Sequence, residues 1–69
     1  MMKIKVNGEE RLIKSNNSIS LDDAMKFLGY SSNTVVVELN QLIINSEEWH
    51  EKYIKSGDKL EIVSIVGGG

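Results

Sequence analysis

The chain of 69 residues contains no cysteine and no proline. Without cysteine it can form neither a disulfide nor a cysteine-ligated zinc site, two devices that commonly stabilise small domains. No apolar run approaches the roughly 20 residues that a membrane-spanning helix requires. The first residues, MMKIKVNGEE, lack the long apolar core and the cleavage site of a signal peptide. We therefore expect one cytoplasmic domain that makes no contact with a membrane.

A large excess of either charge is also missing. Eight Lys and Arg residues stand against ten Asp and Glu residues, which gives a net charge of −2. The basic residues are scattered along the chain, so they offer no electrostatic footprint for nucleic acid. Hydrophobic residues make up 41% of the chain and charged residues 26%, which is typical of a folded globular domain. We expect no nucleic acid among the partners.

Catalytic motifs are absent as well. His50 is the only histidine, and it lies in the acidic stretch EEWHE, where a solvated polar segment is favoured over a metal site. The sequence has no G-x-S-x-G pattern and no phosphate-binding loop. Asp22 and Asp23 suit the start of a helix better than a catalytic carboxylate pair. We therefore expect that the chain is not an enzyme, with no catalytic residue and no metal site.

The first half of the chain predicts a hairpin and a helix. MKIKV alternates apolar residues with lysines, as a half-buried strand does, and the Asn7-Gly8 pair that follows is a hairpin turn signal. EERLIK is the expected returning strand, with ambiguous facing, and SNNSIS is an expected loop. Apolar residues at helical spacing predict a helix from Leu21 to Leu28, with Ser20 as its N-cap and Gly29 as its end.

The second half predicts two further strands and a short helical segment before the last strand. TVVVELN is an expected strand, QLIIN a turn with a short strand, and KSGDKLEIV a turn into the final strand. SEEWHEKYI is expected to be helical, with Ser46 as its cap and with Trp49 and Tyr53 on one side. A mixed sheet with one main helix packed across a face is an α+β architecture. The expected core comprises Ile4, Val6, Leu21, Met25, Leu28, Val35, Val37, Leu60 and Ile62.

The sequence ends in three glycines, Gly67, Gly68 and Gly69. Glycine has no side chain and adopts backbone angles that other residues avoid, so such a segment suits a narrow channel in a partner enzyme. A carboxylate at its end is a poor electrophile, but its attack on the α-phosphorus of ATP would give a reactive acyl adenylate. We expect a domain over residues 1–66 and a flexible tail over 67–69. The alternatives are a frayed terminus or an expression scar.

Four segments in this order resemble one known family: KVNGEE, SLDDAMKFLG, VVVELNQLIINSEEW and SGDKLEIVSIVGGG. Together they are similar to the β-grasp (ubiquitin-like) sulfur carriers of the ThiS type. The resemblance implies that a ubiquitin-activating-like adenylyltransferase uses ATP and magnesium to adenylate Gly69. Sulfur from a desulfurase system then gives a thiocarboxylate, and thiazole synthase takes this sulfur for thiamin biosynthesis. The resemblance also implies that Gly68 completes the family's Gly-Gly end and that the chain itself binds no cofactor.

An apolar surface is expected beside the tail. Leu60 and Ile62 continue the core alternation of the last strand, whereas Val63 and Ile65 fall on the opposite face, as Val36 does in its own strand. We call Val36, Val63 and Ile65 the docking patch, since exposed apolar patches often mark binding sites. The alternative is a bulge near Val63 that shifts the facing and buries these residues.

Other functions stay open at this point. The same tail chemistry serves carriers for molybdopterin or amino-acid biosynthesis and ubiquitin-like protein modifiers. A TGS-type binding module shares a similar last strand, but the acidic balance and the terminal glycines argue against it.

Overall fold

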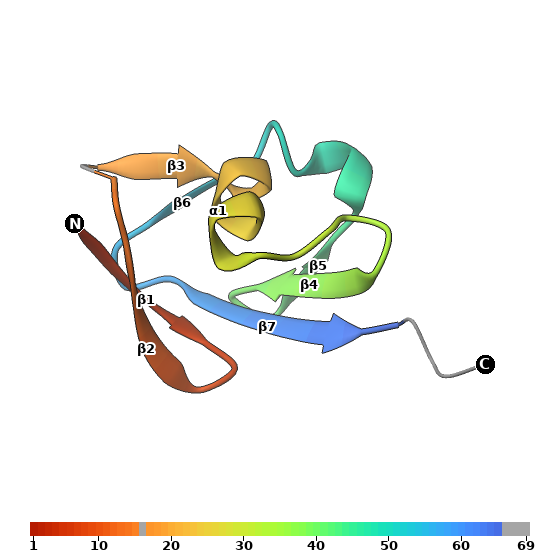
Figure 1. Ribbon diagram of the computed structural model, residues 1–69, viewed down its shortest axis with the longest axis horizontal. Coiled ribbons are helices and arrows are strands. Elements are labelled where there is room, and N and C mark those ends of the chain that lie inside the picture. Colours follow the sequence, from red (N-terminus) through yellow and green to blue (C-terminus); the bar gives the residue numbers. More distant parts are fainter. Residues whose placement is uncertain (16, 66–69) are drawn as a thin grey trace.

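The computed structural model describes residues 1–15 and 17–65. Its elements are β1 (Met2–Val6), β2 (Glu9–Ile13), β3 (Ser18–Ser20), α1 (Leu21–Leu28), β4 (Val35–Leu39), β5 (Leu42–Ile44), a 3₁₀ turn (Ser46–Glu48), β6 (Tyr53–Lys55) and β7 (Lys59–Ser64). Within the described part, five strands form one sheet in the order β2-β1-β7-β4-β5, and β3 pairs with β6. Figure 1 shows α1 lying over the sheet. β1 and β7 run parallel and the other neighbours antiparallel, so the predicted mixed α+β sheet is confirmed.

The β1–β2 hairpin forms as its sequence predicts. Asn7 and Gly8 both have positive φ angles, 52° and 84°, as a two-residue hairpin turn requires. The pairing runs from Met2↔Ile13 to Val6↔Glu9 and settles the ambiguous facing of β2. Ile13 is buried in the core, whereas Leu12 lies on the exposed face of the sheet.

Helix α1 begins and ends at the predicted residues. The Ser20 hydroxyl accepts a hydrogen bond from the Asp23 backbone N–H at 3.0 Å, which caps the first turn. Gly29 takes the left-handed conformation with φ 92°, and its N–H donates to the Lys26 carbonyl. Leu28 was expected in the core but is only partly buried against it, because the last turn of the helix lies at the edge of the apolar cluster.

Two local predictions are wrong. Residues 18–20, expected within a loop, form β3 and pair with β6 from Ser18↔Lys55 to Ser20↔Tyr53. The segment SEEWHEKYI, expected to be helical, forms only one 3₁₀ turn, from Ser46 to Glu48. Ser46 is the first residue of this turn and not its cap. The cap position is Asn45, whose side chain makes no capping hydrogen bond. Trp49 and Tyr53 therefore lie on different sides, with Trp49 only 2% exposed and Tyr53 62% exposed.

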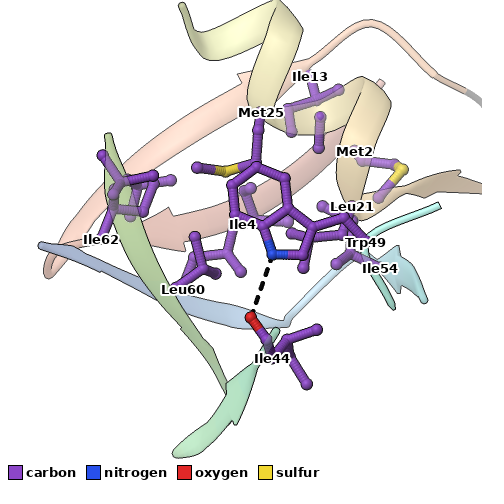
Figure 2. Close-up of a cluster of buried hydrophobic side chains, with 14 residues drawn as sticks. Met2, Ile4, Ile13, Leu21, Met25, Ile44, Trp49, Ile54, Leu60 and Ile62 are labelled. Carbon is purple, nitrogen blue, oxygen red and sulfur yellow. Dashed lines mark hydrogen bonds between the residues drawn. The ribbon is translucent and has the colours of Figure 1, made fainter. Parts of the chain in front are cut away.

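The core lies between α1 and the sheet, and Trp49 occupies its centre. Figure 2 shows the indole among the buried side chains, with its N–H donating to the Ile44 carbonyl at 3.2 Å. Of the nine predicted core residues, all except Leu28 are buried. Buried residues that were not on the predicted list are Met2, Ile13, Ala24, Ile44, Trp49 and Ile54.

Candidate functional site: the exposed end of strand β7

Strand β7 carries the chain out of the core toward the glycines. At its start it pairs with β1 on one side, through Lys5↔Lys59 and Val6↔Leu60. On the other side it pairs with β4 along its length, as far as Val35↔Ser64. The Ile65 N–H then donates to the Thr34 carbonyl at 2.9 Å, which extends this ladder by one step. The position of β7 between β1 and β4 is visible in Figure 1. The end of β7 is thus aligned by β4.

The docking patch lies on one face of this strand end. Val36 and Val63 are direct cross-strand partners. Val63 is 58% exposed and Ile65 57% exposed, whereas Val36 is half-buried. The β4–β7 register continues without interruption from Leu39↔Leu60 to Val35↔Ser64, so the alternative of a bulge that buries these residues is wrong. The role of the patch in docking stays a prediction.

Carboxylates border the docking patch. Glu38 and Glu61 oppose each other on β4 and β7. They lie on the same face as Val36 and Val63, two residues further from the end of β7. Ile43 pairs with Glu38 from β5 and is also exposed, so it widens the apolar surface. Ile43 was not among the predicted docking residues, although three consecutive apolar residues in a strand place at least one side chain on each face of the sheet.

The side chains of His50 and Asp22 form ion pairs with residues near them in the sequence. The His50 Nε2 lies 3.7 Å from the Glu51 Oε1, and both side chains are exposed. Asp22 and Asp23 lie in the first turn of α1, where Asp22 forms an ion pair with Lys26 at 3.3 Å. In residues 1–15 and 17–65 no group of three His, Cys, Asp or Glu side chains is placed to hold a metal ion. No helix in these ranges is long and apolar enough to cross a bilayer.

The predicted tail, Gly67, Gly68 and Gly69, lies outside the described residues, as does the boundary at residue 66. The predicted domain limits therefore stay predictions. What the structure does place is the strand that leads to these glycines and the apolar surface beside it.

A mixed sheet grasping one helix, with β1 parallel to the last strand, is the arrangement of the β-grasp class. The chain belongs to the ThiS family, whose model matches residues 4–69. A crystal structure of thiamine biosynthesis protein ThiS from Geobacter metallireducens superimposes with a TM-score of 0.83 at 28% identity, covering 99% of this chain and 100% of that one. The β-grasp prediction is thereby confirmed.

Three relatives illustrate the proteins whose sequences are similar to this chain. "Uncharacterized protein ycf40" of Trieres chinensis is 39% identical over 93% of this chain and 85% of its own length. "Sulfur carrier protein ThiS" of Bacillus subtilis is 32% identical over 96% of this chain and 98% of its own. "Thiazole synthase" of Paramagnetospirillum magneticum is 38% identical over 99% of this chain, a match that occupies 20% of that protein.

Proposed function

We propose that this protein is a sulfur carrier of thiamin biosynthesis and that it acts as a protein substrate of its partners, in the cytoplasm, rather than as a catalyst. The observation that carries the proposal is the end of β7. There, an exposed apolar strand end leads directly into a sequence of three glycines, in a chain of the ThiS family. The relative from Bacillus subtilis, named as a sulfur carrier, supports the same function.

The proposed reactive group is the carboxylate of Gly69. A ubiquitin-activating-like adenylyltransferase would bind ATP and magnesium, and this chain would bind neither. One oxygen of the carboxylate attacks the α-phosphorus of ATP, the bond to the β-phosphate breaks, and pyrophosphate leaves. Hydrosulfide, released by a reducing thiol from the persulfide that a desulfurase system forms from cysteine, then attacks the carbonyl carbon of the adenylate and displaces AMP. The product is a thiocarboxylate on Gly69, and Gly67 and Gly68 supply the slender approach that a narrow active site requires.

Thiazole synthase is the proposed acceptor of this sulfur. In the Paramagnetospirillum protein of that name, a stretch similar to this whole chain is part of a much longer polypeptide. Joining two proteins in one chain raises the effective concentration of each for the other, which suits a carrier and its acceptor. This fusion favours thiazole formation over molybdopterin or amino-acid biosynthesis as the destination of the sulfur.

The docking patch is proposed to contact the adenylyltransferase. Val63 and Ile65 lie four and two residues before Gly67 in the chain, so a partner that holds them also brings the tail toward its own active site. Burying apolar side chains in this way provides binding energy remote from the reacting atoms, which helps to position the carboxylate.

The test compares the full chain with a variant that lacks Gly68 and Gly69. Each is incubated with the adenylyltransferase, ATP and magnesium, and ATP–pyrophosphate exchange is measured. We expect exchange with the full chain and none with the shortened one, which should keep its fold by circular dichroism because glycine has no side chain to bury. Exchange at an undiminished rate with the folded, shortened chain would show that the chemistry occurs at another group.

Intact-mass analysis of the protein from its native cells separates the remaining functions. A sulfur carrier should show a fraction in which one oxygen is replaced by sulfur. Isopeptide-linked conjugates to lysine would instead indicate a ubiquitin-like modifier, and the complete absence of both products would favour a binding module.

A further inference from the structure

The side chain of Asn7 makes contacts that the hairpin turn does not need. Its backbone N–H donates to the Leu60 carbonyl at 2.9 Å, the last step of the β1–β7 pairing. Its Oδ1 accepts from the Ile62 backbone N–H at 2.7 Å, and its Nδ2 donates to the Ile62 carbonyl at 3.2 Å. We call these two side-chain bonds the Asn7 clamp. The carboxamide thus takes the place of the peptide group that β1 would offer if it continued beyond the turn.

Asparagine suits this position for two separate reasons. The φ of 52° is one that asparagine, aspartate and glycine tolerate better than other residues. Among these three, the asparagine side chain alone carries both a strong donor and a strong acceptor at neutral pH, so it can satisfy both backbone groups of Ile62. Gly8 completes the turn with φ 84°, and a Gly-Gly pair would form the same turn without the clamp.

The clamp lies at the point where β7 leaves the core. Ile62 is buried, and the next residue, Val63, begins the exposed part of the docking patch. β1 itself pairs with β7 only at Lys59 and Leu60, so the Asn7 carboxamide holds the β1 side of the strand two residues further along. It therefore supports from the β1 side the strand end that β4 aligns from the other side.

We propose that Asn7 is a positioning residue for the adenylation of this carrier. By holding Ile62 it orders the end of β7 in advance, so that the docking patch meets the adenylyltransferase in its binding conformation. The inference rests on the proposed function, because it assigns to Asn7 the presentation of that same site.

A second asparagine provides a matched control at the other end of β7. Asn40 also has a positive φ, 51°, in the β4–β5 turn. Its backbone N–H donates to the Lys59 carbonyl at 2.8 Å, and its Oδ1 accepts from the Lys59 N–H at 3.0 Å. Its Nδ2 also donates to the Asp58 Oδ1 at 3.1 Å. Asn40 thus holds the start of the strand as Asn7 holds its end, and removing either side chain takes two hydrogen bonds from the fold.

The experiment compares Asn7→Gly and Asn40→Gly, since glycine keeps both turns. In Asn7→Gly the strand end must be ordered on binding, so we expect KM for the carrier to rise about five- to tenfold with kcat within about twofold. Asn40→Gly should lose about as much stability as Asn7→Gly, measured by urea denaturation, but should leave KM within about twofold of the original value. Amide hydrogen exchange at Ile62, measured relative to the other amides of the sheet, should accelerate in Asn7→Gly and stay unchanged in Asn40→Gly. Asn7→Asp keeps the acceptor but turns a second oxygen toward the Ile62 carbonyl, and its KM should fall between those of Asn7→Gly and the unchanged chain.

Two results would overturn the inference. One is an Asn7→Gly protein with unchanged KM and unchanged amide hydrogen exchange at Ile62. The other is an equal rise of KM in Asn7→Gly and Asn40→Gly, which would mean that Asn7 acts through overall stability. If the unchanged chain supports no ATP–pyrophosphate exchange at all, the proposed function fails and the adenylation role of Asn7 fails with it. Accelerated amide hydrogen exchange confined to Ile62 in Asn7→Gly would still show that Asn7 positions the strand end.

Discussion

Replacing Val63 by aspartate tests the docking patch at the most exposed of its three residues. Full burial of a valine side chain is worth about 1.5–3 kcal/mol, and Val63 is 58% exposed in the free protein. A partner that covers the exposed part would therefore gain about 1 kcal/mol from it, or about fivefold in affinity. A carboxylate at the same place must also be desolvated, which raises the expected increase in KM beyond about tenfold.

The fold should tolerate this change. Val63→Asp removes a cross-strand contact with Val36 that is worth about 0.2–1 kcal/mol. For 69 residues the expected free energy of unfolding is about 3–10 kcal/mol, so the variant stays folded. Phe27→Asp is a matched control, because Phe27 is also apolar and 54% exposed but belongs to α1, across the core from the patch.

The assay is ATP–pyrophosphate exchange by the adenylyltransferase at increasing carrier concentrations. Val63→Asp should raise KM and leave kcat near its original value, whereas Phe27→Asp should change neither. A folded Val63→Asp protein with the original KM would refute the docking role. An equal rise for both variants would show that added negative charge, rather than the patch, weakens binding.

Three further predictions concern stability, each measured by urea denaturation followed by circular dichroism. Leu60→Ala should cost about 2–5 kcal/mol because the side chain is fully buried, and a loss below about 1 kcal/mol would contradict its place in the core. Trp49→Phe removes the donor to the buried Ile44 carbonyl and should cost about 1–3 kcal/mol, so an unchanged midpoint would argue against that hydrogen bond. Ser20→Ala should cost about 1 kcal/mol through the lost bond to the Asp23 N–H, and Ser20→Thr, which keeps the hydroxyl, should retain most of the stability.

The features that the sequence determined by itself are local ones. Helix α1 runs from Leu21 to Leu28 with the predicted cap at Ser20 and the predicted end at Gly29, because capping bonds and a 3.6-residue repeat join residues at most a few positions apart. The alternation in β1 and at Leu60 and Ile62 likewise decided which side chains enter the core, since successive residues of a strand point to opposite faces. The exposure of Val63 and Ile65 followed from the same alternation.

The tertiary structure alone decided the contacts between distant segments. β3 and β6 are three residues each, too short to show a period, and their pairing depends on bringing Ile19 to Ile54. Trp49 and Tyr53 would share one side only if the helix continued, but the 3₁₀ turn ends at Glu48. The packing of Trp49 into the core decides where the turn ends. Asn7 and Ile62 are 55 positions apart in the sequence. The Asn7-Gly8 pair predicts a hairpin turn, but it does not predict which residue the Asn7 side chain contacts. Such contacts depend on strand order and register, which arise only when the whole core is assembled.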